Sequence, residues 1–353
     1  MAHSPNTKRG RGIAENPTGR FEQLAYEPEA CSEEIEAISP QTQFLKDSAR
    51  SIISSNDSPD LPFDAGLNPY RGCEHGCSYC YARPYHEYLG FSAGLDFETR
   101  ILVKEDAPEL LRKALSSPTW APQVLSMSGV TDCYQPIEKQ LRLTRQCLEV
   151  LLAYRNPVGV ITKNQLVTRD VDLLSALAKH KAVCVGLSIT TLDPDLARRM
   201  EPRTSSPNRR LDAIRTLSDA GIPTGVMVAP VIPGLTDHEI PAIVSAAAQA
   251  GALCASFTAV RLPGNVAPLF ETWLETHFPD RRDKVMNRIR DLHGGRTQSS
   301  EFGTRLRGQG QIAEQIKSLF DLACKKSGLV YPLPKLSTAA FRRPGPVQHT
   351  LFE

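Results

Sequence analysis

Short apolar runs alternate with amphipathic segments along the middle of this chain, and this alternation constrains its fold more than any other feature. The runs are predicted to be strands at 67–71, 124–127, 158–162, 182–190, 224–229 and 254–260. Helices are predicted between them at 138–154, 171–179, 196–200, 209–220 and 238–250. Strands joined by helical crossovers form right-handed βαβ units and a parallel sheet. Six such units favour an open, partial (β/α)6 TIM-like barrel over a closed eight-stranded one.

The remaining chain flanks this α/β core. Residues 1–60 are predicted to form an extended, partly disordered N-terminal arm with one short helix near 33–38. The barrel core is expected to span residues 61–262, with a strand at 101–104 and a helix at 107–115 inserted after the first unit. Residues 263–328 are predicted to form a helical extension, and residues 329–353 an extended tail.

Composition limits the class of protein. No apolar run approaches the roughly 18–20 residues that cross a bilayer. The polar N-terminus has no apolar segment of the kind found in secretory signals. The 353 residues include nine cysteines, an odd number that favours reduced thiols, metal ligands or a reactive sulfur over a disulfide framework. The expected location is the cytoplasm.

Three cysteines form the strongest local motif, in the pattern C-x3-C-x2-C. Cys73, Cys77 and Cys80 follow the first predicted strand, and nearby glycines permit a tight loop. Cysteine thiolates are the usual ligands of [4Fe–4S] clusters, so three of them would leave one of the four irons open. An open iron is a binding site. The alternative is a zinc knuckle with His75 as the fourth ligand, but no second pair of zinc ligands lies nearby.

With the aromatic Tyr79 directly before the last cysteine, the motif resembles the signature of the radical SAM superfamily, over residues 61–262. The resemblance implies a partial (β/α)6 barrel whose [4Fe–4S] cluster binds S-adenosyl-L-methionine. It also implies reductive cleavage of that cofactor to a 5′-deoxyadenosyl radical, which abstracts hydrogen from a substrate. The electron would come from a donor such as flavodoxin or ferredoxin.

Further segments are similar to the spore photoproduct lyase-like branch of that superfamily, which implies DNA repair and lyase chemistry. They are 68–73, 80–83, 162–163, 188–190, 201–203 and 229–230. By this resemblance Tyr79 lines the adenine pocket and Lys163 pairs with the cofactor's carboxylate. Ser188 would hydrogen-bond its ribose, and Ala229 would offer backbone groups to adenine.

The loop after the second strand departs from that branch. Ser128, Thr131 and Asp132 supply its polar atoms and are candidates to contact the cofactor's methionine part. The resemblance places a hydrogen-donor cysteine where this chain has Gly129, which argues against thymine-dimer repair by the same relay. Cys133 as a displaced donor and Tyr134 as a relay are the catalytic candidates. A loop cysteine without a catalytic role is the alternative.

Two C-terminal features suggest partners. Eight basic residues between Arg281 and Arg307 suit phosphate contacts, although interspersed acidic residues allow simple ion pairing instead. The peptide from Gln348 to Phe352 looks like the motif by which bacterial repair proteins dock on the sliding clamp. It could equally fold back on its own core.

The sequence therefore predicts a radical SAM enzyme acting on a substrate such as a nucleic-acid base or lesion. One alternative is a radical modifier of RNA or of a peptide. The alternative from another class is a non-catalytic, metal-bearing adaptor that docks on DNA or on the sliding clamp.

Overall fold

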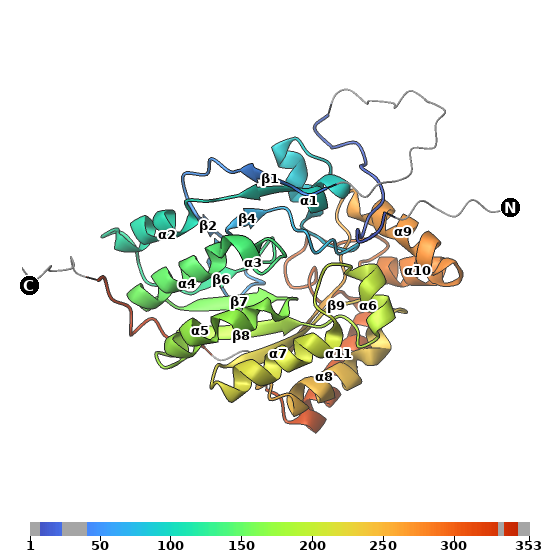
Figure 1. The fold of residues 1–353 in the computed structure, drawn as a ribbon. Coiled ribbons are helices and arrows are strands. Elements are labelled where there is room, and N and C mark those ends of the chain that lie inside the picture. Colours follow the sequence, from blue (N-terminus) through green and yellow to red (C-terminus); the bar gives the residue numbers. More distant parts are fainter. Residues whose placement is uncertain (1–7, 23–40, 331–334, 345–353) are drawn as a thin grey trace, which may run out of the picture.

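The computed structural model describes residues 8–22, 41–330 and 335–344, and its central element is a seven-stranded sheet (Figure 1). The strand order is β10-β9-β8-β7-β6-β3-β2. The strands are β2 (Ile53–Ser55), β3 (Ala65–Leu67), β6 (Leu125–Met127), β7 (Val158–Thr162), β8 (Val183–Ser188), β9 (Thr224–Val231) and β10 (Cys254–Ala259). Every neighbouring pair from β3 to β10 is parallel, and β2 adds an antiparallel edge to β3. The predicted α/β fold with a partial TIM-like barrel is confirmed.

Helices lie between the strands along the chain, and the longer ones pack an apolar face against the sheet. They are α2 (Ala107–Ser116), α3 (Glu138–Leu141), α4 (Leu143–Tyr154), α5 (Val171–Ala178), α6 (Pro194–Met200), α7 (Pro207–Asp219) and α8 (Ile240–Gln249). Helices α4, α5, α7 and α8 lie side by side along one face (Figure 1). Buried leucines and isoleucines of these helices, such as Leu151, Leu174 and Ile214, join one core with the buried residues of the strands. Burying such side chains is the main driving force for this arrangement.

The first predicted strand is split between two sheets. Residues Ala65–Leu67 form β3, whereas β4 (Tyr70–Arg71) belongs to a second sheet of order β1-β5-β4 with β1 (Gln43–Lys46) and β5 (Arg100–Val103). Pro69 lies between the two strands and has no N–H to donate to a ladder. The predicted helix at 138–154 is likewise two helices, because Arg142 adopts a left-handed conformation with φ 54°.

The C-terminal extension contains α9 (Val266–His277), α10 (Arg282–Leu292) and α11 (Gly310–Ser327). The chain between α10 and α11 bridges the two edges of the main sheet. On one side the N–H of Ala259, at the end of β10, donates to the Leu306 carbonyl at 2.8 Å. On the other side Asp60, between β2 and β3, accepts from the Gly303 N–H and the Arg305 guanidinium, both at 2.6 Å.

Two sequence predictions fall outside the described ranges, namely the helix near 33–38 and the peptide from Gln348 to Phe352. Within those ranges, no helix combines the length and the apolar character needed to cross a membrane.

Candidate active site at the carboxyl ends of the strands

The three motif cysteines lie in one tight loop between β4 and the 3₁₀ helix η1 (Arg83–Leu89). Gly72 and Gly76 have φ values of +79° and +66°, which only glycine adopts without strain. Cys73 and Cys77 are buried, Cys80 is half-buried, and all three thiols are free. Burial raises the pKa of each thiol above its usual value. A thiolate in this loop therefore needs positive charge close by, which a bound metal centre supplies.

The donor set fits an iron–sulfur cluster, since three free thiols within eight residues are available as iron ligands. In the part of the chain that the structure describes, no three His, Cys, Asp or Glu side chains, these cysteines included, converge closely enough to hold a single metal ion. A four-iron cluster does not require such convergence, because each thiolate binds a different iron.

A buried ion pair holds the cysteine loop. Arg83 is fully buried and donates to the Cys77 carbonyl from Nε at 3.1 Å and from Nη2 at 2.9 Å. It also donates to the Gly94 carbonyl at 2.8 Å and pairs with Glu98 at 2.5 Å. An ion pair this deep is stable only when its remaining hydrogen-bonding groups also have partners. The pair therefore fixes the backbone at the second cysteine.

The N-terminal segment 8–22 packs directly on this loop. The N–H of Gly12 donates to the Glu98 carboxylate at 3.0 Å, and Ile13 is buried. A Cβ added at Gly12 would lie 1.6 Å from the Gly76 carbonyl oxygen, so only glycine fits there. Part of the predicted arm thus forms a wall of the cysteine loop.

A polar cluster occupies the carboxyl ends of β7, β8 and β9. The Lys163 ammonium donates to Ser188 Oγ at 2.9 Å, to Thr190 Oγ1 at 3.0 Å and to the Ala229 carbonyl at 2.9 Å. It also lies 5.7 Å from the centroid of the Tyr79 ring. The structure therefore brings together Tyr79, Lys163, Ser188 and Ala229, the four residues expected to hold the adenosyl and carboxylate parts of the cofactor.

Glu201 anchors this cluster and was not among the predicted site residues. Its buried carboxylate lies 3.1 Å from the Lys163 ammonium, pairs with Arg210, and accepts hydrogen bonds from Tyr79 and Thr190. Burial alone would raise the pKa of Glu201, but the charges of Arg210 and Lys163 and these hydrogen bonds hold it far below its usual value. The sequence signal for Glu201 is the segment 201–203, which resembles the family, but the resemblance assigns no role to the glutamate.

Asp132 connects the loop after β6 to the cluster. It accepts from Thr162 Oγ1 at 2.7 Å and from the Lys163 N–H at 2.8 Å, and lies 3.3 Å from His75 Nδ1. Burial opposes ionisation of Asp132, yet His75 and these hydrogen bonds keep its pKa below the usual value. The other ring nitrogen of His75 lies 3.2 Å from the Asn164 amide. Both nitrogens of His75 thus have protein partners, which does not favour its role as a zinc ligand.

Ser128 and Thr131 organise the same loop rather than joining the lysine cluster. Ser128 Oγ accepts from the Cys133 N–H at 2.9 Å, and Thr131 Oγ1 donates to the Tyr70 carbonyl at 3.0 Å. Of the three polar residues predicted from this loop, Asp132 alone contacts Lys163.

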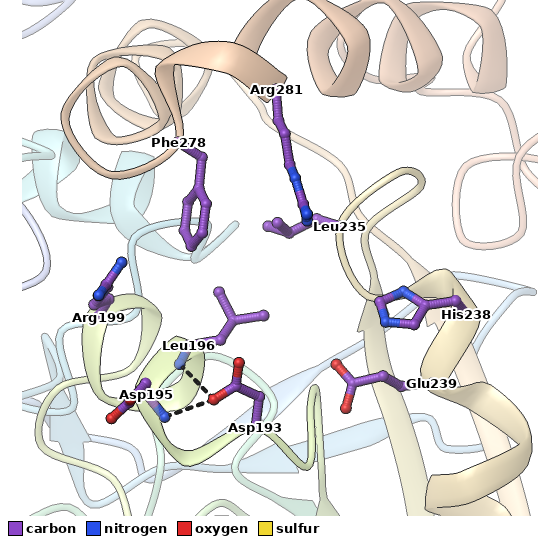
Figure 2. A pocket seen from close by; sticks show the side chains of 9 residues that line it. All are labelled: Asp193, Asp195, Leu196, Arg199, Leu235, His238, Glu239, Phe278 and Arg281. Carbon is purple, nitrogen blue, oxygen red and sulfur yellow. Dashed lines mark hydrogen bonds between the residues drawn. The ribbon is translucent and has the colours of Figure 1, made fainter.

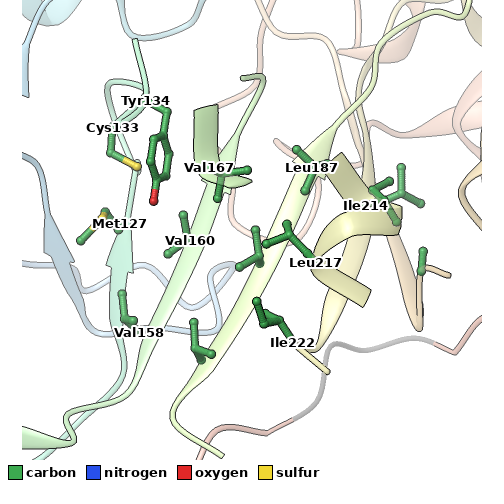
Figure 3. Packing of buried hydrophobic residues seen from close by; sticks show 14 of the residues in the cluster. Met127, Cys133, Tyr134, Val158, Val160, Val167, Leu187, Ile214, Leu217 and Ile222 are labelled. Carbon is green, nitrogen blue, oxygen red and sulfur yellow. The ribbon is translucent and has the colours of Figure 1, made fainter. Parts of the chain in front are cut away.

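Cys133 and Tyr134 lie in the hydrophobic core (Figure 3). Cys133 is 1% exposed, and Tyr134 is fully buried with its hydroxyl donating to Asp170 at 3.0 Å. Their neighbours in the cluster include Met127, Val160 and Val167. The structure therefore does not place these two side chains with the lysine cluster.

A cavity of about 550 Å³ opens between α6, the loop after β9 and the start of the C-terminal extension (Figure 2). Its lining comprises Asp193, Asp195, Leu196, Arg199, Leu235, His238, Glu239, Phe278 and Arg281. The carboxylates of Asp193 and Glu239 accept hydrogen bonds from backbone N–H groups of α6 and the loop before it. Among the described residues, no carboxylate pairs with the guanidinium groups of Arg199 and Arg281.

The other basic residues predicted to contact nucleic acid are largely used within the chain. Arg282 pairs with Glu271 at 2.8 Å, and Arg305 pairs with Asp60 at 2.6 Å. Arg288 lies 3.7 Å from Asp237. The ion-pairing interpretation therefore holds for part of this region, whereas Arg281 faces the cavity in Figure 2.

Comparison with known proteins adds independent information. A family model described as the radical SAM superfamily matches residues 67–247. An uncharacterised protein of Mycobacterium tuberculosis is 36% identical over 235 residues, which cover 66% of this chain and 68% of the relative. A Pseudomonas phage M6 protein named radical SAM Nalpha-GlyT isomerase is 29% identical over 173 residues, or 48% of this chain and 34% of that protein.

Among solved structures, spore photoproduct lyase complexed with dinucleoside spore photoproduct has a similar fold. Its TM-score is 0.59 at 18% identity, covering 80% of this chain and 79% of that one. A mutant of the same enzyme with bound AdoMet and dinucleoside spore photoproduct gives a TM-score of 0.57 at 18% identity, covering 80% and 78% of the two chains.

Proposed function

This chain belongs to the radical SAM superfamily, and we propose that Cys73, Cys77 and Cys80 hold a [4Fe–4S] cluster whose open iron binds S-adenosylmethionine. When bound and reduced, the cluster supplies the electron that cleaves S-adenosylmethionine into methionine and a 5′-deoxyadenosyl radical. The observation that carries the proposal is the shared location of the three free thiols, Tyr79 and Lys163 at one end of the barrel. The carboxyl ends of parallel strands are where such barrels build active sites.

Lys163 binds the carboxylate of S-adenosylmethionine in this proposal. An ammonium has three donors, and all of those on Lys163 point to neutral or anionic oxygens within 3.1 Å. Glu201 already has Arg210 as a counter-charge. To bind the carboxylate of S-adenosylmethionine, Lys163 would therefore exchange one of its neutral acceptors for that carboxylate.

Tyr79, Ser188 and Ala229 bind the adenosyl part. Tyr79 offers an aromatic ring to adenine, and its hydroxyl is tied to Glu201 so that the ring cannot turn away. Ser188 Oγ and the Ala229 carbonyl are already joined at 2.8 Å. They can exchange this contact for the ribose hydroxyls and the adenine edge. Asp132 positions Lys163 through its backbone N–H.

The proposed substrate is a nucleic-acid base or a base lesion. The protein of similar fold was solved with a dinucleoside photoproduct. In this chain, Arg199 and Arg281 face a cavity without a carboxylate partner among the described residues (Figure 2). Guanidinium groups suit phosphate oxygens. Hydrogen transfer through Cys133 or Tyr134 would require a rearrangement, because both side chains are buried in the core.

Electron paramagnetic resonance of the anaerobically reconstituted, dithionite-reduced protein tests the open iron. We expect a four-iron signal that changes on addition of S-adenosylmethionine, because the cofactor binds an iron directly. Lys163→Met should keep the cluster signal but need more S-adenosylmethionine to produce the change. A four-iron signal that stays unaltered at saturating S-adenosylmethionine contradicts the proposal and favours a non-catalytic, metal-bearing adaptor.

A further inference from the structure

A second cavity, of about 450 Å³, lies beside the cysteine loop and has no role in the proposed cofactor site. Tyr85 and Tyr88 of η1 form one wall, and Ile52 to Ser54 around β2 form another. Gly72 and Ala82, which flank the cysteine motif, belong to its lining, as does Val130 from the loop after β6. We call this cavity the tyrosine cleft.

The two tyrosines line the tyrosine cleft and are both exposed, and the Phe21 ring packs beside Tyr88 with ring centroids 5.1 Å apart. Tyr85 is 53% exposed and Tyr88 is 66% exposed. Side chains three positions apart in a 3₁₀ helix lie on one face, so both rings line the same side. The guanidinium of Arg20 lies 5.5 Å from the centroid of the Tyr88 ring. Exposed aromatic side chains that line a cavity are typical of a ligand-binding site, and their rings can stack on a flat aromatic ligand.

Two cations, Lys104 and Arg71, also line the tyrosine cleft. Lys104 lines the tyrosine cleft, donates to the Asn68 carbonyl at 3.0 Å, and has no carboxylate partner among the described residues. Burial and the nearby charge of Arg71 lower the pKa of Lys104. Arg71 has a single carboxylate partner, Asp47, at 2.7 Å. A further anion in the cleft would relieve the repulsion between these two cations.

The tyrosine cleft is continuous with the loops that build the candidate active site. Gly72 directly precedes Cys73. Val130 lies two residues before Asp132, and its N–H donates to the Asn68 side chain at 3.5 Å. The Tyr81 hydroxyl, one residue after Cys80, donates to the Gly129 carbonyl at 2.6 Å. A ligand in the cleft would therefore lie next to a substrate at the cysteine loop.

We propose that the tyrosine cleft binds a nucleotide of single-stranded DNA adjacent to the base that reacts. The base stacks on Tyr85 and Tyr88, and the phosphate contacts Lys104. Aromatic side chains next to cations are the usual platform for single-stranded nucleic acid, because every base has a π-face and every link carries a charge. This inference rests on the proposed nucleic-acid substrate and adds the site that holds the strand.

Fluorescence anisotropy with an end-labelled oligothymidylate of about a dozen nucleotides tests the proposal on the anaerobically reconstituted, full-length protein. Tyr85→Ala/Tyr88→Ala should weaken binding by about 5- to 150-fold, the effect of losing the stacking of one base. Tyr85→Phe/Tyr88→Phe keeps the rings and should bind within about threefold of wild type. Phe44→Ala removes another exposed aromatic, on β1, and is the matched control. It should leave the affinity unchanged.

The salt dependence of oligothymidylate binding tests whether Lys104 contacts a phosphate. Lys104→Gln should make the slope of log affinity against log salt less steep by about 0.7, the value for one phosphate contact on a single strand. Circular dichroism should show that all variants keep the wild-type secondary structure. Equal affinities of wild type and Tyr85→Ala/Tyr88→Ala, or an equal loss with Phe44→Ala, would overturn the inference.

Wild-type behaviour separates this inference from the proposed function. If wild type forms 5′-deoxyadenosine from S-adenosylmethionine but binds no oligothymidylate, the tyrosine cleft is not a DNA site and the radical chemistry stands. If wild type binds the strand through the tyrosines but forms no 5′-deoxyadenosine, the cleft stands and the enzymatic proposal fails.

Discussion

Replacing Glu201 with glutamine should destabilise the protein far more than a like change in an exposed ion pair. Glu201 is fully buried and pairs with Arg210, which is also buried. Glutamine keeps the volume and can still accept from Thr190, but it leaves the Arg210 guanidinium without its counter-charge. Removing one partner of a buried ion pair costs about 3–5 kcal/mol. We therefore expect Glu201→Gln to lower the free energy of unfolding by about that amount.

Urea denaturation followed by circular dichroism measures this loss, with Asp212→Asn as the control. Asp212 pairs with Arg215 at 2.9 Å on the same helix that carries Arg210, but both side chains are 56% exposed. Such surface pairs contribute below about 1 kcal/mol. Similar destabilisation by both variants would refute the reasoning, because the buried carboxylate would then contribute no more to the free energy of unfolding than a solvent-exposed one.

Comparing wild type with Glu201→Gln at different pH values also tests the charge of Glu201. The pKa of Glu201 in the folded protein lies far below its unfolded value. Its contribution to stability is therefore complete above the unfolded value of about 4.3 and decreases as the pH falls toward the folded value. The gap in unfolding free energy between wild type and Glu201→Gln should be constant near neutral pH and shrink below about pH 4. A gap that widens on acidification would contradict the assigned charge.

Three further predictions concern the loop, the cofactor and acid stability. Gly12→Ala should lower the iron content per chain while the secondary structure is retained, because the added Cβ would meet the Gly76 carbonyl. The control is Gly159→Ala, since a Cβ added there has no neighbour within 4 Å. Lys163→Met should weaken S-adenosylmethionine binding, measured by calorimetry, by about 10- to 100-fold, which is the effect of losing one charge-assisted hydrogen bond. Lys179 is exposed, and Lys179→Met should leave this binding unchanged. His86 is buried and burial lowers its pKa to about 4, so folding keeps it neutral while the unfolded chain takes up a proton. Stability should fall by up to about 3 kcal/mol between pH 6.5 and 4, and His86→Gln should lose less over that range, as measured by urea denaturation.

The sequence predicted the strands where local pattern and tertiary structure agree. Residues 158–162 form a short apolar run, as expected of a strand in a parallel sheet, and β7 has those bounds. The prediction failed at 67–71, where Pro69 separates β3 from β4 and the chain moves to another sheet. It also missed the break at Arg142, since the apolar repeat continues through it and nothing local signals a left-handed residue.

The residues of the candidate site were also predicted only in part. The cysteines were found because their spacing is itself the chemical signal, and Lys163 was named from the family resemblance. Gly12 and Glu201 were missed as site residues because partners of each lie far away in the sequence. Arg83 was missed although its partners lie within 15 positions, because no local pattern shows that its guanidinium is buried. The Gly12 N–H meets a carboxylate 86 positions away, and the Tyr79 hydroxyl meets one 122 positions away. Only the folded chain reveals such contacts.

Formation of 5′-deoxyadenosine is the decisive measurement for the proposed radical chemistry. The anaerobically reconstituted protein is reduced with dithionite, given S-adenosylmethionine and assayed by chromatography, with Cys77→Ala and Cys147→Ala alongside. Cys147 is buried in α4, away from the cysteine loop, and is the matched control. We expect 5′-deoxyadenosine from wild type and from Cys147→Ala but none from Cys77→Ala. Absence of product from a wild-type protein that holds a complete four-iron cluster would contradict the proposed radical chemistry.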